Sequence, residues 1–236
     1  MNVKELLKKE RLPEAIFLGR AAEMIFDGAN VNLGIGYTSL IPNYALPGKV
    51  IHYYSENGIY EYGSALDLED YKELGDHDFI DTSGFYLTPD PGLAFSDILT
   101  SMQAVQKVDF TFLGFLQVSE KGDLANHTRF LSPPDMRSRQ IANVGGGMDM
   151  VSRAKRVVAV GNHVSEREEI KILRKCSYPL TGVECVDTII TDLAFIEVTK
   201  EGLVLKEIAP GWRVEEIQAL TEPKLMMAPD LKEMTL

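Results

Sequence analysis

The chain has 236 residues, of which 45% are hydrophobic and 25% charged, so it can bury a substantial core and is not expected to be disordered. Its net charge of −11 and its pI near 4.9 disfavour binding to nucleic acid or to an anionic membrane, because both attract basic proteins. The first 11 residues lack the apolar segment of a signal peptide, and no run reaches the roughly 18 apolar residues that span a bilayer. We therefore expect a cytoplasmic protein that binds neither nucleic acid nor a membrane.

The first half of the chain alternates between helical and strand patterns. A helical pattern begins at Leu12 and is closed by Asp27-Gly28, where a glycine is typical of a helix end. The elements expected next are a strand at residues 31–33, a short helix at 37–46, strands at 50–54 and 78–81, a turn at 89–92, a helix at 95–105 and β structure over 108–118.

The second half becomes richer in strands toward its end. The expected elements are a turn at 121–123, a short helix at 149–154, strands at 157–160, 188–191, 194–198 and 203–205, a helix at 214–220 and an extended or irregular tail at 223–236. Residues 200–202 form the turn of a hairpin in this interpretation. The alternation predicts an α/β fold with an open, mainly parallel sheet flanked by helices and a β-rich C-terminal part. We expect residues 1–236 to form a single domain.

A glutamate, Glu56, stands in the motif Ser55-Glu56-Asn57-Gly58, directly after the apolar run at residues 50–54. The pattern predicts a buried strand that ends in a tight turn. Such a turn holds a carboxylate on a rigid element and leaves the backbone open to a substrate, as a covalent nucleophile requires. The alternative is an exposed turn residue, because charged side chains mostly stay solvated.

Further motifs rich in glycine and polar residues follow one another along the chain. They are Asn32-Leu33-Gly34-Ile35-Gly36, Leu113-Gly114 with Gln117-Val118-Ser119, Gly122-Asp123-Leu124-Ala125-Asn126, Gly145-Gly146-Gly147-Met148-Asp149 with Ala154-Lys155, and Pro179-Leu180-Thr181-Gly182. With these motifs and Ser55-Glu56-Asn57-Gly58, nearly the whole chain resembles the B (beta) subunit of class I coenzyme A (CoA) transferases of the 3-oxoacid/acetate type. The resemblance implies a CoA-transferase/NagB-like α/β architecture.

The resemblance also implies the chemistry and its residues. Glu56 corresponds to the covalent nucleophile of a ping-pong reaction that passes through an acyl-glutamyl anhydride and a glutamyl-CoA thioester, with CoA as a substrate and with no permanently bound cofactor or metal. Gly146 corresponds to a donor of the oxyanion hole, which stabilises charge on the reacting carbonyl; a flexible turn is the alternative. Asn126 corresponds to an active-site asparagine that hydrogen-bonds the acyl or thioester carbonyl, with turn capping as its alternative.

Other residues are expected to contact the substrate or CoA. They are Gly34, Gly36, Asn57, Gly145 and Gly147. A tight strand-to-helix turn at Gly34 and Gly36 is compatible with that role. The glycine run does not have the Gly-x-Gly-x-x-Gly spacing of a dinucleotide site.

The histidines, serines and cysteines do not show the spacing that is typical of a metal site or a catalytic triad. The four histidines lack metal-ligand spacing, and His163 is expected at the end of a strand rather than in catalysis. No serine stands in a Gly-x-Ser-x-Gly motif. Cys176 and Cys185 are expected to be free, partly buried thiols.

The resemblance further implies a separate A (alpha) subunit, with which the chain forms a heterodimer or a heterotetramer whose active site lies at their junction. Residues 83–91 and 127–139 depart from the 3-oxoacid pattern, which leaves the donor and acceptor acids open. Arg129, Arg137 or Arg139 can read a second carboxylate or a CoA phosphate, because guanidinium suits bidentate anion binding; a solvated basic patch is the alternative. Two other functions also stay open, an acyl-CoA hydrolase that uses the same glutamate and a non-catalytic ligand-binding or scaffold subunit.

Overall fold

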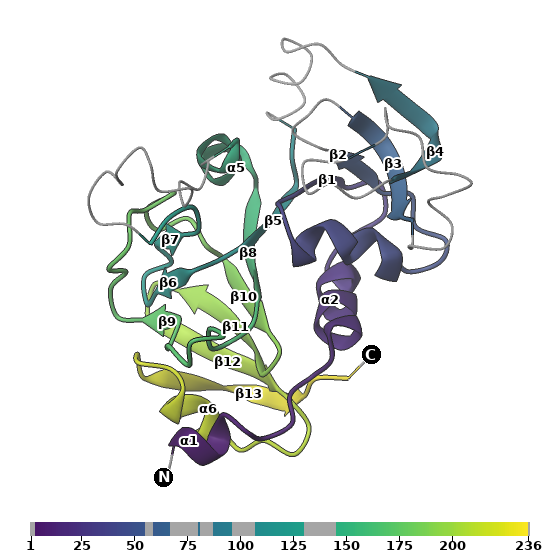
Figure 1. The fold of residues 1–236 in the computed structure, drawn as a ribbon. Helices are drawn as coiled ribbons and strands as arrows, with labels where there is room; N and C mark the ends of the chain where they lie inside the picture. Colours follow the sequence, from purple (N-terminus) through teal and green to yellow (C-terminus); the bar gives the residue numbers. More distant parts are fainter. Residues whose placement is uncertain are drawn as a thin grey trace.

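The computed structural model describes residues 3–54, 59–66, 80, 87–95, 107–129 and 145–235. Its main sheet contains β1 (Asn30–Leu33), β2 (His52–Tyr54), β3 (Ile59–Ala65), β4 (Leu87–Phe95), β5 (Phe110–Gly114), β8 (Arg156–Gly161), β10 (Thr188–Thr191), β11 (Ala194–Thr199), β12 (Gly202–Ile208) and β13 (Leu225–Glu233). Within the described ranges this sheet has ten strands in the order β13-β12-β11-β10-β8-β5-β1-β2-β3-β4 (Figure 1).

The centre of the sheet is parallel, and its two sides are partly antiparallel. The parallel pairs are β1–β2, β1–β5, β5–β8, β8–β10 and β12–β13, and the antiparallel pairs are β2–β3, β3–β4, β10–β11 and β11–β12. The predicted mainly parallel α/β sheet with a β-rich C-terminal part is thus confirmed.

The strand order reverses next to β1. The chain runs outward from β1 through β2 and β3 to β4, and then returns to place β5 on the other side of β1. Open α/β sheets bind their ligands outside the carboxyl ends of the strands at such a reversal. A ligand site is therefore expected among the residues that follow β1, β5 and β8.

Helices and a small second sheet cover the two faces of the main sheet. The α-helix α2 (Glu14–Glu23) and the 3-10 helix η1 (Tyr37–Tyr44) share one hydrophobic core with β1 and with Phe110 and Phe112 of β5. The opposite core contains Leu113 and the sheet β7-β6-β9, formed by β6 (Gln117–Ser119), β7 (Leu124–Ala125) and β9 (Ile172–Leu173). Neighbouring residues of β5 thus serve opposite cores, as the alternation of side chains along a strand requires.

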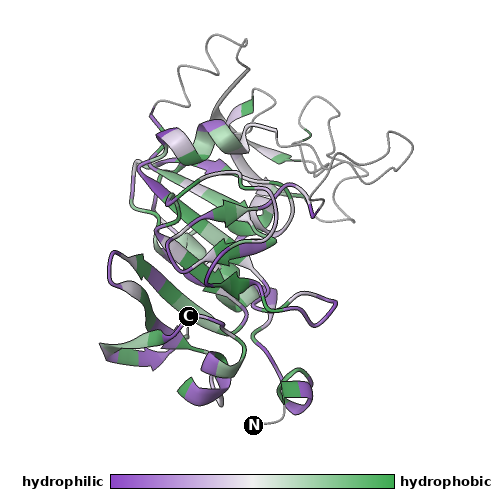
Figure 2. Ribbon diagram, turned by 90° about the vertical axis from the view of Figure 1, so that its left-hand side faces the viewer, coloured by the Kyte–Doolittle hydropathy of each residue, from purple (hydrophilic) through white to green (hydrophobic). Residues whose placement is uncertain are grey.

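The remaining helices lie around this framework. The helix α1 (Val3–Leu6) lies beside α6 (Val214–Ala219) near the N-terminus (Figure 1), and Trp212 donates a hydrogen bond to the Glu10 carbonyl at 2.7 Å. The helix α5 (Gly147–Arg153) directly precedes β8. Hydrophobic residues follow the central strands, while hydrophilic ones gather on turns and helices (Figure 2). No helix in the described part of the chain is long and apolar enough to cross a membrane.

Most predicted elements are confirmed with small changes of boundary. The helix expected at 37–46 is of the 3-10 type, and the β structure expected over 108–118 is divided into β5 and β6. Most of the strand expected at 78–81 and of the helix expected at 95–105 lies outside the described residues. The short elements α1, β3, β7 and β9 were not predicted.

At the sides of the sheet one prediction is wrong and one is made more specific. The expected turn at residues 89–92 is wrong, because these residues belong to β4, which pairs with β3 at one edge of the sheet. Proline is tolerated in an edge strand since its missing N–H can face away from the neighbour. The tail at residues 223–236, expected to be extended or irregular, is extended and contains β13, a parallel neighbour of β12 at the other edge.

Candidate active site

The turn after β1 brings the backbone close to the neighbouring strand β5. The Gly34 N–H donates to the Phe112 carbonyl at 2.8 Å, and a Cβ at Gly34 would lie 2.9 Å from Leu113 Cδ2. Gly36 has a φ of 95°, a conformation that L side chains rarely adopt. Gly36 therefore suits the positive φ of a tight strand-to-helix turn, and Gly34 suits its close approach to the β5 backbone, where a Cβ would lie 3.2 Å from the Phe112 carbonyl oxygen.

A buried polar row joins the three strands at this end of the sheet. The Asn32 amide donates to the Tyr54 carbonyl at 3.4 Å, and Thr111 Oγ1 donates to Asn32 Oδ1 at 2.9 Å. Asn32 and Thr111 are fully buried, where polar side chains need such partners. Asn32 thus ties β1 to the last residue of β2.

The predicted nucleophile follows that residue. Glu56 and Asn57 lie outside the described residues, between the end of β2 at Tyr54 and the start of β3 at Ile59. Because β1, β2, β5 and β8 are parallel, the end of β2 lies at the same edge of the sheet as Gly34 and Gly114. The strand predicted to lead into Glu56 is present.

A second group of predicted residues lies together around Asn126. Thr181 Oγ1 donates to Asn126 Oδ1 at 2.5 Å and is 2.9 Å from His127 Nδ1. A Cβ at Gly147 would lie 3.4 Å from Thr181 Cγ2 and 4.0 Å from Asn126 Nδ2. The structure therefore brings Asn126, Gly147 and Thr181 into one cluster, which we call the Asn126 cluster.

The glycine run at residues 145–147 comes directly before α5, and its last residue, Gly147, begins the helix and belongs to this cluster. Gly145 has a φ of 55°, and the Gly146 carbonyl accepts the Met150 N–H at 3.0 Å in the first turn of α5. Pairing of Leu124 with Gly182 holds Thr181 opposite Asn126. Because the Asn126 oxygen accepts the hydrogen bond from Thr181, the Nδ2 group is the donor that this side chain can offer to a ligand.

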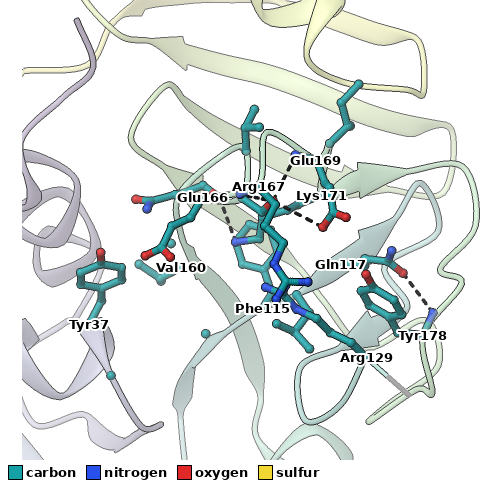
Figure 3. Close-up of a pocket in the computed structure, with 18 of the residues that line it drawn as sticks. Tyr37, Phe115, Gln117, Arg129, Val160, Glu166, Arg167, Glu169, Lys171 and Tyr178 are labelled. Atoms are coloured by element: carbon teal, nitrogen blue, oxygen red, sulfur yellow. Dashed lines mark hydrogen bonds between the residues drawn. The ribbon is translucent and has the colours of Figure 1, made fainter. Parts of the chain in front are cut away.

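A cavity of about 680 Å³ opens where the strand order reverses. Its walls come from the residues after β1, β5 and β8, from Arg129 and from the segment before β9 (Figure 3). Apolar walls are supplied by Ile35, Phe115, Leu116, Val160 and Val164, and charged groups by Arg129, Glu166, Arg167, Glu169 and Lys171. We call this cavity the switch-point cavity.

The partly buried Lys171 is the most perturbed charge in this cavity. Its Nζ donates to the Asn162 carbonyl at 2.9 Å and lies 3.7 Å from the centre of the Phe115 ring. Burial lowers the pKa of Lys171 to about 8; the charge of Asp192 opposes this shift, and that of Arg129 adds to it. No residue in the described ranges forms a salt bridge with this ammonium within 4 Å.

His163 has a structural position at the end of β8. It is fully buried, and its ring nitrogens each lie 2.9 Å from a threonine hydroxyl, those of Thr191 and Thr221. Burial lowers the pKa of His163 to about 3, so the ring is neutral at physiological pH. This agrees with a strand-end residue outside catalysis.

The cysteines are free, and burial raises the pKa of Cys176 to about 12 and that of Cys185 to about 11. Thiols with raised pKa values are poor nucleophiles, since the thiolate is the reactive form. In the described ranges no His, Cys, Asp and Glu side chains form a group that could hold a metal ion.

Of the three arginines named from the sequence, Arg129 lines the switch-point cavity, and Arg137 and Arg139 lie outside the described residues. Lys171 could not be predicted as a site residue, because a lone lysine near a strand has no characteristic spacing. Thr181 is recognisable from the sequence only as part of the motif Pro179-Leu180-Thr181-Gly182. The long-range contacts that give both residues their importance become visible only in the folded chain.

The chain is similar in sequence to known coenzyme A transferases. It is 35% identical to the beta chain of a probable coenzyme A transferase of Bacillus subtilis over 210 residues, covering 87% of this chain and 91% of the relative. It is 39% identical to the B component of the 3-oxoadipate CoA-transferase of Pseudomonas putida over 206 residues, covering 86% and 91%. It is also 39% identical to a mitochondrial succinyl-CoA:3-ketoacid coenzyme A transferase of Mus musculus, covering 91% of this chain but 40% of that relative.

Solved structures share the fold. An acyl-CoA transferase (YdiF) of Escherichia coli O157:H7 superposes with a TM-score of 0.68 at 18% identity, over 96% of this chain and 44% of that one. A variant of the decarboxylase AibA/AibB gives the same TM-score and identity over 96% and 90%, so the fold by itself does not determine the reaction. No family model matches the chain. Because the chain is 35% and 39% identical to relatives of which it covers 91%, it belongs to the coenzyme A transferase family and is of the B (beta) type.

Proposed function

We propose that the chain, together with an A subunit, transfers CoA from an acyl-CoA to a carboxylic acid through covalent intermediates on Glu56. The observation that carries the proposal is the identity to CoA-transferase B subunits over nearly their whole length. The presence of Glu56 after β2 supports it further, because the parallel centre of the sheet directs the end of β2 to the same edge as the Gly34–Gly36 turn.

The proposed reaction has two half-reactions. A carboxylate oxygen of Glu56 attacks the thioester carbonyl, the carbon–sulphur bond breaks, and CoA leaves as a thiolate from an acyl-glutamyl anhydride. The thiolate then attacks the glutamyl carbonyl, the carbon–oxygen bond of the anhydride breaks, and the donor acid departs as a carboxylate. The resulting glutamyl-CoA thioester passes CoA to the second acid by the reverse steps, so this route involves no cofactor or metal.

The other predicted residues have roles in stabilising charge and in binding. Each attack places negative charge on a carbonyl oxygen, and a preorganised N–H donor stabilises that charge. We assign one such donor to the Gly146 amide and a second hydrogen bond to Asn126 Nδ2, which the Asn126 cluster leaves available. Gly34, Gly36, Asn57, Gly145 and Gly147 are assigned to the binding of substrate or CoA.

Trapping the intermediate tests the mechanism. The chain is co-expressed with its A subunit, incubated with an acyl-CoA and treated with borohydride, which reduces a glutamyl thioester to an alcohol. We expect the mass change on the peptide that contains Glu56. We also expect Glu56→Gln to lower CoA transfer by roughly 10⁴-fold or more, as loss of a nucleophile does, while the exposed-turn variant Glu201→Gln retains full activity.

Two outcomes contradict the proposal. Normal transfer by Glu56→Gln would exclude Glu56 as the nucleophile. Release of free CoA at the same rate with and without an acceptor acid would identify a hydrolase.

A further inference from the structure

Two side chains of the Asn126 cluster and the neighbouring His127 form a continuous series of hydrogen bonds. Thr181 Oγ1 lies 2.5 Å from Asn126 Oδ1 on one side and 2.9 Å from His127 Nδ1 on the other. Thr181 is only 3% exposed, so these two side chains, rather than solvent, are the partners of its hydroxyl. The proposed function gives a role to Asn126 and none to Thr181 or His127.

The number of available protons fixes the direction of these hydrogen bonds. A threonine hydroxyl has a single hydrogen to donate, and a carbonyl oxygen can only accept. Thr181 therefore donates to Asn126 Oδ1 and accepts a hydrogen bond from His127. The ring of His127 consequently carries a proton on Nδ1, which selects one of the two neutral tautomers.

The backbone around Thr181 holds its hydroxyl in place. The Thr181 N–H donates to the Leu124 carbonyl at 2.7 Å, and the Leu124 N–H donates to the Gly182 carbonyl at 2.9 Å. Leu124 belongs to β7, so Thr181 is fixed to the strand that leads into Asn126. A hydroxyl held in this way restricts the rotation of the Asn126 amide.

The two ends of the Asn126 amide face different groups. Its oxygen accepts from Thr181, whereas a Cβ at Gly147, the first residue of α5, would lie 4.0 Å from its Nδ2. Hydrogen bonds in series polarise one another. Donation from His127 to Thr181 therefore strengthens the hydrogen bond to the Asn126 oxygen, and the polarised amide becomes a stronger donor at Nδ2.

From these contacts we propose that Thr181 and His127 are positioning residues of the CoA transfer, which orient the Asn126 side chain and strengthen its Nδ2–H group as a donor to the reacting carbonyl oxygen. This inference rests on the role proposed above for Asn126. His127 is the first residue of the segment 127–139 that departs from the 3-oxoacid pattern. Its contribution is therefore a property of this chain and is not implied by the resemblance.

Matched variants of Thr181 test the inference on the chain assembled with its A subunit. We expect Thr181→Val to lower kcat by about 5- to 50-fold, as removal of a buried hydrogen-bond partner does. The KM for acyl-CoA is expected to change by less than about 3-fold, because the donor acts on charge that develops in the transition state. Thr181→Ser keeps the hydroxyl and is expected to retain kcat within about 3-fold.

Thr199→Val is the matched control for loss of a threonine hydroxyl. Thr199 Oγ1 donates to the Gly202 carbonyl at 2.8 Å, between β11 and β12. Its loss is expected to leave kcat unchanged. An equal loss of kcat in Thr181→Ser and Thr181→Val would show that the hydroxyl is not responsible and would overturn the proposal.

Variants of His127 isolate the contribution of its ring nitrogen. The Nδ2 of an asparagine is bonded to Cγ, as the Nδ1 of histidine is, and it is also a donor. We expect His127→Asn to retain kcat within about 2-fold and His127→Leu to lower it by about 3- to 10-fold. Equal losses in the two variants would contradict the role of His127.

A double-mutant cycle separates positioning from a general structural effect. If Thr181 acts through Asn126, then Thr181→Val lowers kcat by less than about 2-fold when it is added to Asn126→Ala. The same loss with and without Asn126→Ala would overturn the proposal.

The tautomer of His127 tests the arrangement of protons without catalysis. The chain is labelled with ¹⁵N-histidine, assembled with its A subunit and examined by NMR at a pH at which imidazole rings are neutral, and His127→Asn identifies the signals of His127. We expect the proton on Nδ1. A proton on Nε2 alone would overturn the proposal, because Thr181 would then donate to the ring and not to Asn126.

The same measurements separate this inference from the proposed function. The Nδ1 tautomer together with absent CoA transfer in wild type would contradict the proposed function and retain the arrangement of the three side chains. Normal CoA transfer by Thr181→Val would contradict the positioning role alone.

Discussion

Lys171 combines a charge with an environment that disfavours it. Burial and the charge of Arg129 lower its pKa from 10.5 to about 8, although the charge of Asp192 acts in the opposite direction. Between these two pH values the unfolded chain binds more protons at this site than the folded chain does. The contribution of Lys171 to folding is therefore unfavourable below pH 8 and disappears as the pH rises to 10.5.

We expect Lys171→Met to be more stable than wild type at pH 7, by roughly 1–3 kcal/mol. The difference is expected to shrink as the pH rises from 8 to 10.5, because wild-type Lys171 then loses its proton in both states. Urea unfolding of both proteins at several pH values measures this. A constant difference across the range would show that the charge of Lys171 does not cause it.

At the scale of elements, α2 is fastened to the C-terminal strands by a buried ion pair. Arg20 of α2 donates to both carboxylate oxygens of Glu207 in β12, at 3.0 to 3.1 Å. Glu207 is 3% exposed, and its other cation, Lys232, lies 3.6 Å away on an exposed side chain. Arg20 also lies over the Phe195 ring at 4.6 Å from its centre.

We expect Arg20→Met to lower the free energy of unfolding by about 3 kcal/mol, because it leaves a buried carboxylate without its main partner. Lys232→Met, which removes an exposed cation from the same carboxylate, is expected to lower it by less than about 1 kcal/mol. Urea unfolding at pH 7 compares the two variants. Equal losses would mean that the Arg20 pair contributes no more than a surface contact.

The position of a strand in the sheet explains whether the sequence could predict it. The strands β8, β10 and β11 are apolar runs bounded by turn residues, and their burial in the sheet centre makes the pattern strong. β4 and β13 contain proline, which argues against a central strand, so their pairing at the sheet edges could not be seen from local pattern.

The residues of the candidate site also fall into two groups, those that the sequence could predict and those that it could not. Asn126, Gly34 and Gly147 belong to motifs that the sequence displays, whereas Lys171 and Thr181 act through partners far away in the chain, Phe115 for Lys171 and Asn126 for Thr181. Contacts of this kind depend on the order of the strands, which periodicity does not report. The assignment of Glu56 as the nucleophile stays a prediction, as does the single domain over residues 1–236.

At the scale of the whole molecule, the chain covers 40% of the length of a mitochondrial relative and 91% of the length of two bacterial relatives of the B type. We expect the isolated chain to bind CoA weakly and to show no measurable transfer. Adding the A subunit is expected to restore activity up to a plateau at equal molar amounts, since the proposed active site needs residues of both subunits. Activity titration and sedimentation measure this, and full transfer by the isolated chain would contradict it.

The composition of the two outer strands determines whether a further strand can pair with the edges of the sheet. β4 includes Pro89 and Pro91, and β13 includes Pro229 followed by Asp230, and such residues interrupt the row of N–H donors that a further strand would need. Among the strands that the structure describes, neither outer one offers an uninterrupted template for another chain. We expect these prolines to disfavour strand-to-strand aggregation, so that contacts of the sheet edges with other chains are made by side chains.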